Sequence, residues 1–311
     1  MNTAAPDSPA SSPSPAAVDR YAVIGHPIGH SLSPRIHALF AQATGQAMVY
    51  EAIDGGSQPG GFEAAVAAFA ADGGRGLNVT LPFKLRALAL ADSASADARL
   101  AGAANALRLQ EGRIEAHNFD GLGLVRDITA RLRQPLQGRR VLLLGAGGAA
   151  RGALLPLARA GIACPRIANR SADKAEALAA EFAPRLPGCP VRGMGLEQLA
   201  ALSAPHEGFD IVINATSASL AAQSPAVPAP LLAAAALAYD MVYGAAPTPF
   251  MQAACAAGCP RQSDGLGMLV EQAAESFAWW RGLRPDTSAA LDAVRAALQA
   301  QQRGAAADQR P

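Results

Sequence analysis

The chain has 311 residues, half of them hydrophobic, so it is long enough for one large domain or two ordinary ones with a core that needs no disulfides. Its 26 Lys and Arg nearly balance its 25 Asp and Glu, which excludes the basic surface of a protein that binds nucleic acid or an anionic membrane. No apolar run could span a bilayer, and the four cysteines form no C-x-x-C pair and have no His at metal-ligand spacing, so we expect a cytoplasmic protein without a metal.

The first eighteen residues, Met1 to Val18, consist mainly of Ala, Pro and Ser. They lack the apolar core of a secretory signal, and they carry too few bulky apolar side chains to offset the entropy that folding would cost. We therefore predict a disordered tail at residues 1–18, and a similar composition from about Gln301 to Pro311 predicts the same for the other end.

Folded sequence is expected to begin with a buried strand at Tyr21 to Ile24, a short apolar run that Gly25 ends. Ser33 and Pro34 predict the start of a helix, with the serine at the N-cap and the proline at the first helical position. Alternating strands and helices follow, which predicts an α/β fold with a mostly parallel sheet. The further elements expected in this part are a strand at about Met48 to Ile53, a helix at Gly61 to Ala71, a strand at Gly76 to Thr80, a helix opened by Pro82, and a strand pair from Leu107 to Glu115 around a turn at Glu111 and Gly112.

The apolar run from Arg140 to Gly145 begins a second series, because a hydrophobic segment that enters a glycine cluster is typical of a central parallel strand. This series predicts a second α/β unit, so we place a domain boundary near Gly121. The elements expected after this strand are a helix at Gly148 to Ala160, a strand at Arg166 to Asn169, a helix at Ser171 to Phe182, strands at Phe209 to Asn214 and Ala238 to Tyr243, and helices at Leu266 to Trp280 and about Thr287 to Gln301.

The glycine cluster fits the dinucleotide-binding pattern G-x-G-x-x-[G/A] and stands between a predicted strand and a predicted helix, as that pattern requires. Gly145 would permit the tight turn, Gly147 would let the backbone approach a pyrophosphate, and Ala150 would let the helix pack closely on the strand. The helix N-terminus would offer free N–H groups to the phosphates. The alternative is a tight turn that binds nothing, but the context favours a cofactor site at Gly145, Ala146, Gly147, Gly148, Ala149 and Ala150.

The residues after the next strand decide between NAD and NADP. Sites for NAD place a carboxylate about twenty residues after the glycines to bind the ribose 2′-hydroxyl. This chain has Asn169, Arg170 and Ser171 there, with Lys174 one turn later. A guanidinium can grip a 2′-phosphate with two hydrogen bonds. The alternative is a solvated helix start, which is less favourable because cations oppose the dipole there, so these four residues predict NADP as the cofactor.

Four polar clusters stand at the ends of strands in the first unit, where ligands bind in open α/β sheets. Each has an ordinary structural explanation. Ser33 and Asp120 could cap helices, while Asn78 and Asn105 could close turns. Lys84 could be a solvated helix lysine. The clusters are Ser31-Leu-Ser33-Pro34, Asn78-Val-Thr80-Leu-Pro82-Phe-Lys84, Ala101-Gly-Ala-Ala-Asn105 and Asn118-Phe-Asp120-Gly121.

Together these clusters resemble the shikimate dehydrogenase family in order and spacing, from about Tyr21 to Trp280. Two positions depart from the commonest family pattern, because Ala106 and Phe119 each stand where a Thr is frequent. We expect these departures to change affinity and local hydrogen bonds rather than to abolish activity. The second unit matches the same family at the glycine cluster and at Asn169-Arg170, Asn214-Ala-Thr216-Ser, Tyr239-Asp-Met241-Val-Tyr243, Thr248-Pro-Phe250 and Asp264-Gly265-Leu-Gly-Met268-Leu-Val-Glu-Gln272.

The resemblance implies two α/β domains: an N-terminal substrate domain with a mainly parallel sheet, and a Rossmann domain that binds NADP. The substrate domain would comprise residues 19–121, completed by C-terminal helices at 262–300, and the Rossmann domain would comprise residues 122–261. The implied activity is the reversible NADP-dependent reduction of 3-dehydroshikimate to shikimate in aromatic amino acid and chorismate biosynthesis. A monomer or a homodimer is expected.

The same resemblance implies that Lys84 and Asp120 are the catalytic pair. A cationic Lys84 near the reacting oxygen can donate a proton and stabilise the negative charge that develops there, while the cofactor supplies the hydride. Asp120 would position the ammonium group and hold a substrate hydroxyl. The other implied contacts are Ser31 and Ser33 for the substrate carboxylate, Thr80, Asn105 and Gln272 for the ring hydroxyls, Tyr243 in the cleft, and Thr216, Met241, Gly265 and Met268 beside the cofactor.

Two other functions are compatible with this sequence. One is a quinate or quinate/shikimate dehydrogenase that uses NAD, and Arg170 in place of a carboxylate argues against the NAD version. The other is a non-catalytic protein that senses NADP on the same fold. The presence of both Lys84 and Asp120 argues against this second alternative, because a sensor needs no acid–base pair.

Overall fold

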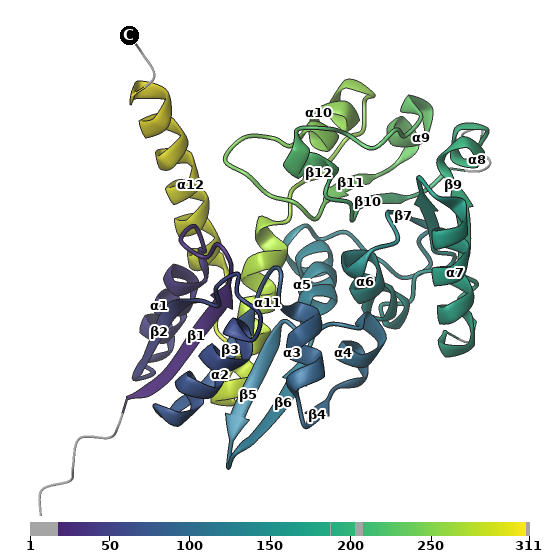
Figure 1. Cartoon of the computed structure of the whole chain (residues 1–311). Helices are drawn as coiled ribbons and strands as arrows, with labels where there is room; N and C mark the ends of the chain where they lie inside the picture. Colours follow the sequence, from purple (N-terminus) through teal and green to yellow (C-terminus); the bar gives the residue numbers. More distant parts are fainter. Residues whose placement is uncertain (1–17, 187, 203–207, 309–311) are drawn as a thin grey trace, which may run out of the picture.

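The computed structural model describes residues 18–186, 188–202 and 208–308 and builds them around two six-stranded sheets. Two helices, α5 (Asp120–Arg126) and α11 (Leu266–Arg281), lie between the two parts of the molecule (Figure 1). The tail predicted at residues 1–18 falls outside the described part except for Val18. Of the helices in the described ranges, none is long and apolar enough to cross a membrane.

The first sheet is mixed and has the strand order β2-β1-β3-β5-β6-β4. Strand β1 is parallel to both β2 and β3, while β5 runs antiparallel to β3 and forms a hairpin with β6. Parallel pairings are therefore in the majority, as predicted, and the predicted hairpin provides the antiparallel part. The elements are β1 (Asp19–Gly25), α1 (Ser33–Thr44), β2 (Met48–Asp54), α2 (Gly61–Ala71), β3 (Gly74–Val79), α3 (Lys84–Leu90), β4 (Ser93–Ala94), α4 (Ala96–Ala101), β5 (Ala106–Gln110) and β6 (Arg113–His117).

The second sheet is parallel throughout and has the order β12-β11-β10-β7-β8-β9. This is the doubly wound Rossmann order, in which the chain reverses direction across the sheet between β7 and β10. Ligands bind beyond the carboxyl ends of the strands at such a point. The elements are β7 (Val141–Leu144), α6 (Gly148–Arg159), β8 (Arg166–Asn169), α7 (Ala172–Phe182), β9 (Arg192–Gly195), α8 (Leu196–Ala200), β10 (Ile211–Asn214), α9 (Ala229–Ala234), β11 (Leu237–Asp240), α10 (Pro249–Ala256) and β12 (Gln262–Ser263).

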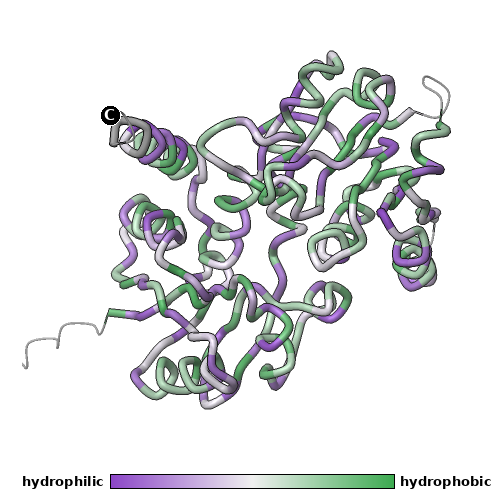
Figure 2. The backbone as a smooth tube through the Cα atoms, turned by 45° about the horizontal axis from the view of Figure 1, so that its top comes forward, coloured by the Kyte–Doolittle hydropathy of each residue, from purple (hydrophilic) through white to green (hydrophobic). Residues whose placement is uncertain are grey.

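Helices cover both faces of the second sheet, which explains the unbroken apolar run of β7. Val141 and Leu143 belong to the hydrophobic cluster on one face, and Leu142 and Leu144 belong to the cluster on the other. Since neither face is wetted, all four positions are apolar. The helices outside the sheet instead alternate between hydrophobic and hydrophilic residues (Figure 2).

The C-terminal segment returns to the first sheet. Helices α11 and α12 (Ser288–Asp308) pack against α1, and Ile36 and Phe40 of α1 share a core with Val270, Phe277 and Val294. Figure 1 shows the two ends of the colour scale, α1 and α12, next to each other. The last helices therefore complete the core that the first helix begins.

The structure corrects the predicted C-terminal tail, because α12 continues through Gln301 to Asp308. It also corrects two predicted helix starts. Helix α1 begins at Ser33 itself, with Leu32 at the N-cap and no side-chain cap, so the N-cap role that we predicted for Ser33 is wrong. Helix α3 begins at Lys84 rather than at Pro82, because the N–H of Phe83 donates to the carbonyl of Thr80 and closes a separate turn first. That turn contains Pro82 and delivers Lys84 at the first position of the helix.

Candidate active site

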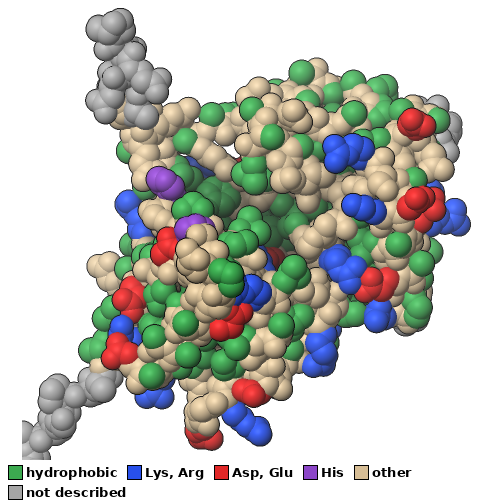
Figure 3. All heavy atoms as spheres, viewed as in Figure 1, with side chains coloured by type: hydrophobic (Ala, Val, Ile, Leu, Met, Phe, Trp, Pro, Cys, Tyr) green, Lys and Arg blue, Asp and Glu red, His purple; other side chains and the backbone are tan. Residues whose placement is uncertain are grey.

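A cavity of about 720 Å³ lies between the two sheets. Figure 3 shows the hollow that leads into it, with hydrophobic side chains in its depth. The loops after the strands of both sheets line it together with α11. Of the residues predicted to bind substrate or cofactor, those that line it are Ser31, Ser33, Thr80, Lys84, Asn105, Asp120, Gly148, Ala149, Thr216, Met241, Tyr243, Gly265, Met268 and Gln272.

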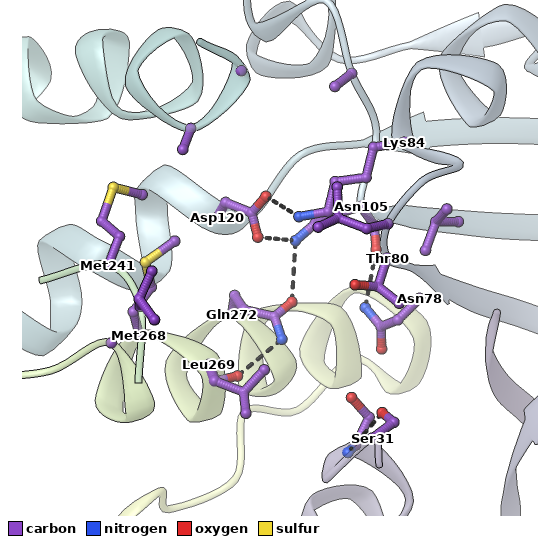
Figure 4. A pocket seen from close by; sticks show the side chains of 18 of the residues that line it. Ser31, Asn78, Thr80, Lys84, Asn105, Asp120, Met241, Met268, Leu269 and Gln272 are labelled. Carbon is purple, nitrogen blue, oxygen red and sulfur yellow. Dashed lines mark hydrogen bonds and ion pairs between the residues drawn. The ribbon is translucent and has the colours of Figure 1, made fainter. Parts of the chain in front are cut away.

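Lys84 and Asp120 form an ion pair inside this cavity. The Lys84 Nζ lies 2.6 Å from Asp120 Oδ2, and the two side chains are 28% and 20% exposed. Each residue is the first of a helix, α3 and α5 respectively, and each therefore follows a turn that ends at the cavity. This geometry is that of a partly shielded pair that a ligand can reach, and it does not fit a solvated surface lysine (Figure 4).

Asn105 fixes the position of Asp120 from behind. The Asn105 Nδ2 donates to Asp120 Oδ1 at 2.8 Å and to Gln272 Oε1 at 3.1 Å. Its own Oδ1 accepts from the backbone N–H of Phe119 at 2.8 Å, so the amide orientation is set from both ends. A carboxylate held in this way keeps one oxygen for the Lys84 ammonium group. Figure 4 shows these four polar side chains converging from α3, the start of β5, α5 and α11.

A buried network that the sequence analysis missed supports Asn105. Asn78, at 4% exposure, donates through Nδ2 to the carbonyl of Asn105 and to Ser276 Oγ. Its Oδ1 accepts from the Tyr50 hydroxyl at 2.8 Å and lies 3.1 Å from His37 Nε2. Because an amide oxygen only accepts, the His37 ring must carry its proton on Nε2. Burial lowers the pKa of His37 to about 3, so this ring is neutral.

Ser31, Ser33 and Tyr243 also line the cavity. The Ser31 Oγ accepts from the Ser33 N–H at 3.3 Å, while Ser33 is buried. Burial first, and then the Asp264 carboxylate, raise the pKa of Tyr243, so its hydroxyl keeps its proton and can donate a hydrogen bond. In the view of Figure 4, Ser31 lies on the opposite side of Gln272 from Met241 and Met268.

The glycine-rich turn follows β7 and leads into α6. Gly145 has a φ of +102°, which favours glycine, and a Cβ there would lie 3.0 Å from Thr216 Cγ2. At Gly147 and Gly148 a Cβ would meet no atom within 4 Å, so the backbone faces open space. Ala150 is fully buried in the core. This is an open backbone cradle at the N-terminus of a twelve-residue helix.

The residues predicted to select NADP lie apart from the main cavity. Arg170 is exposed after β8 and lines a second pocket of about 470 Å³ with Gly195, Glu197 and Gln198. Within the described ranges, the Arg170 guanidinium has no carboxylate partner. Asn169 donates from its side chain to the carbonyl of Ser171, which shapes the turn. Lys174 is exposed on α7 and is not among the residues that line this pocket.

The chain matches known proteins over nearly its whole length. Residues 23–107 match the model of the shikimate dehydrogenase substrate binding domain, residues 127–226 that of shikimate / quinate 5-dehydrogenase, and residues 265–295 that of the shikimate 5′-dehydrogenase C-terminal domain. The NADP(+) shikimate dehydrogenase of Aromatoleum aromaticum is 54% identical over 281 residues, which cover 90% of this chain and 98% of the relative. The chain belongs to the shikimate dehydrogenase family.

Solved structures of similar proteins agree with this assignment. The crystal structure of an Ael1 enzyme from Pseudomonas putida superposes with a TM-score of 0.82 at 55% identity and covers 88% of this chain and 97% of that one. A shikimate 5-dehydrogenase from Thermus thermophilus, crystallised with NADP(H) and shikimate, gives a TM-score of 0.74 at 35% identity over 90% of this chain and all of that one. The predicted fold of two α/β units is confirmed.

No cluster of three or more potential metal-ligating side chains occurs within the described ranges of this shikimate dehydrogenase family member. The residues that the sequence analysis missed are those behind the site, His37, Tyr50 and Ser276. Their side chains meet at Asn78 from three different elements. No spacing along the sequence links these positions, and only the sheet register brings Tyr50 and Asn78 to the same site.

Proposed function

We propose that this chain catalyses the reversible NADP-dependent reduction of 3-dehydroshikimate to shikimate. The observation that carries the proposal is the Lys84–Asp120 ion pair, which lies in a cavity shared by the substrate-side loops and the loops of the Rossmann sheet. The curated relative from Aromatoleum aromaticum has the same named activity at 54% identity. An acid–base group and a dinucleotide cradle that open into one cavity are what a carbonyl reductase needs.

The residues present fit NADP. Gly147 and Gly148 leave backbone exposed at the N-terminus of α6, where a pyrophosphate would meet free N–H groups. Arg170 stands where a 2′-phosphate would need a cation. The Glu197 carboxylate in the same pocket would repel the phosphate. Thr216, Met241, Gly265 and Met268 would form the wall beside the nicotinamide. When bound, the reduced cofactor supplies the hydride.

In this proposal Lys84 acts at the ketone oxygen of the substrate. Its ammonium group donates a proton to that oxygen during reduction and takes one back during oxidation. Asp120 holds the ammonium group in place and accepts a hydrogen bond from a ring hydroxyl, while Thr80, Asn105 and Gln272 bind the remaining hydroxyls. Ser31 and Ser33 bind the substrate carboxylate, and Tyr243 donates a hydrogen bond in the cleft.

Nicotinamide absorbance tests the proposal directly. The purified protein is mixed with shikimate or quinate, each with NADP⁺ or NAD⁺, and reduced cofactor is measured. We expect turnover to be fastest with shikimate and NADP⁺. Preferred turnover of quinate with NAD⁺ would establish the alternative dehydrogenase, and cofactor binding without any turnover would establish a sensor.

We also propose that the protein is cytoplasmic and works as a monomer or a homodimer. Its four cysteines are all free in the structure, which fits a reducing compartment. Size-exclusion chromatography with light scattering gives the oligomeric state, and a mass near 31.6 kDa would establish the monomer.

A further inference from the structure

Asp240 is a fully buried carboxylate that the proposed chemistry does not use. It is the last residue of β11 and has no exposed surface. In the described part of the chain, no Lys or Arg lies within ion-pair distance of it. A buried charge without a counter-ion is costly unless hydrogen bonds compensate it. Its environment must therefore supply several donors.

Four donors surround this carboxylate. The Asp240 Oδ1 accepts from Asn214 Nδ2 at 3.0 Å and from the backbone N–H of Val242 at 3.0 Å. The Oδ2 accepts from the hydroxyls of Ser219 and Thr248, each at 2.6 Å. Both oxygens are thus fully engaged inside the protein. No position on the carboxylate is left for a ligand.

These donors belong to separate segments of the cofactor side. Asn214 ends β10, and its Oδ1 accepts from the N–H and the hydroxyl of Thr216. Ser219 lies in a short 3₁₀ helix, Ala218–Ala221, while Thr248 caps the N-terminus of α10. The segments after β10 and β11 both line the cavity, through residues such as Thr216 and Met241. One carboxylate therefore joins two adjacent walls of the cleft.

The connection continues into α11. The N–H of Met241 donates to the carbonyl of Asn214, and the N–H of Gly265 donates to the carbonyl of Val242 at 3.1 Å. Gly265 immediately precedes α11, which carries Met268 and Gln272. The wall after β11 is therefore joined by one backbone hydrogen bond to the residue that precedes α11.

We propose that Asp240 is a positioning residue that sets the relative placement of the two cavity walls formed after β10 and β11. This inference rests on the proposed function only in that these walls face the cofactor. Asp240 touches neither substrate nor cofactor and acts through Thr216, Ser219 and the Met241–Val242 backbone. Without its charge, four donors compete for a weaker acceptor, and the walls lose their fixed spacing.

The test compares Asp240→Asn with Asp210→Asn. Asp210 stands at the other end of β10, where its side chain accepts from the Arg140 N–H, and it does not line the cavity. NADP⁺ dissociation constants are measured by calorimetry on the free protein, hydrogen exchange is followed at the Thr216 and Val242 amides, and kcat and both KM values are measured. For Asp240→Asn we expect about tenfold weaker NADP⁺ binding and faster hydrogen exchange at both amides. The shikimate KM should stay within about threefold of the wild-type value. For Asp210→Asn we expect only lower stability.

Several results would overturn the proposal. They are unchanged NADP⁺ affinity in Asp240→Asn, equal losses of affinity in the two variants, or a shikimate KM that rises as much as the NADP⁺ constant. If Asp240→Asn does not fold, Ser219→Ala removes one donor to the same carboxylate and must show the same pattern with a smaller amplitude. Binding and exchange need no turnover, so a wild-type protein that binds NADP⁺ but does not oxidise shikimate would sink the proposed function alone.

Discussion

Lys84 and Asp120 form an ion pair, but the two residues would perform different tasks in catalysis. Lys84 can act on charge that develops mainly in the transition state, whereas Asp120 would also touch a substrate hydroxyl in the ground state. Substitutions of the two residues should therefore have different effects on kcat and KM. A loss in kcat alone indicates the first task, and a loss in both kcat and KM indicates the second.

Replacing Lys84 by Ala is expected to lower kcat by roughly 10²–10⁴-fold, the range typical of losing a general acid. The KM for shikimate should change far less, and NADP⁺ binding by calorimetry should stay normal. Lys84→Arg should not restore the rate, because a guanidinium does not release its proton. Asp120→Asn should change kcat and KM together. A folded Lys84→Ala enzyme with near-normal kcat would assign the proton donor elsewhere.

Replacing Arg170 by Ala is expected to weaken NADP⁺ binding by about 1.5–3 kcal/mol, since a charged hydrogen-bond donor to the 2′-phosphate is lost. NAD⁺ has no such phosphate, so its affinity should barely change. Arg113→Ala is the control, because this arginine is exposed on β6 and lines neither pocket, so both affinities should stay unchanged. Equal weakening of both cofactors in Arg170→Ala would show that the arginine does not bind the 2′-phosphate.

The buried His37 makes stability depend on pH. Burial lowers its pKa from the ordinary 6.5 to about 3, so below pH 6.5 the unfolded chain takes up a proton that the folded chain does not. Stability is then lost as the pH falls, by about 1.4 kcal/mol between pH 7.5 and 5.5 from this residue. His37→Phe keeps an aromatic ring against Tyr50, which stacks on His37 at 4.0 Å, but removes the titration. Urea unfolding at the two pH values should show a smaller pH effect in the variant; an equal effect would contradict the assignment.

Among the elements, α5 packs against both α6 and α11. A Cβ on Gly121 would overlap the carbonyl of Gly152 on α6. On the other side, a Cβ on Gly123 would lie 2.8 Å from both the N–H of Gln272 and the carbonyl of Met268 on α11. Two glycines thus let one helix touch both others backbone to backbone, and Asp120 and Gln272 are brought together as a result.

Gly123→Ala is expected to destabilise the protein by about 1–3 kcal/mol, because the added methyl group must push α11 away. It should also raise the shikimate KM, since α11 carries Gln272. Gly304→Ala is the control. Gly304 lies in α12, where an added Cβ would meet no atom within 4 Å, so the better helix propensity of Ala should stabilise by up to about 1 kcal/mol. Denaturant unfolding of both variants tests this prediction. An unchanged free energy of unfolding in Gly123→Ala would show that α11 moves aside without cost.

The elements with strong local patterns could be predicted from the sequence, and the others could not. Helix α2 and strand β8 have the predicted bounds, because apolar periodicity and flanking turns define them. Strands β4 and β12 have only two residues each, too few for any alternation to be visible. The glycine turn and Lys84 belong to continuous motifs, whereas the partners of Asn78 and Asp240 come from distant segments. Such networks depend on strand register, which no local pattern encodes.

At the scale of the whole molecule, we propose that residues 19–121 form one domain together with the last helices. The second domain then begins at residue 122. The two residues of β12 fall in the range 262–300 that we assigned to the first domain, but they pair with β11 in the second sheet. The division that fits the sheets therefore places residues 264–300 with the first domain. Ile36 and Phe40 need the apolar side of α11 to be buried.

A fragment of residues 18–126 is therefore expected not to unfold cooperatively, because it leaves the α1 side of its core in water. The same fragment joined to residues 264–300 by a flexible Gly/Ser linker should unfold cooperatively. Circular dichroism during urea unfolding compares the two. A cooperative transition in the shorter fragment would show that the first sheet folds without the C-terminal helices.

The return of α11 and α12 to α1 also has a consequence during synthesis on the ribosome. The second sheet is one continuous stretch, β7 to β12, so it can assemble as soon as that stretch has left the exit tunnel. The first sheet emerges earlier but must wait for α11 and α12, which are translated after the second sheet. The first sheet is thus completed after the second, and until then its apolar surface around Phe40 is a target for chaperones.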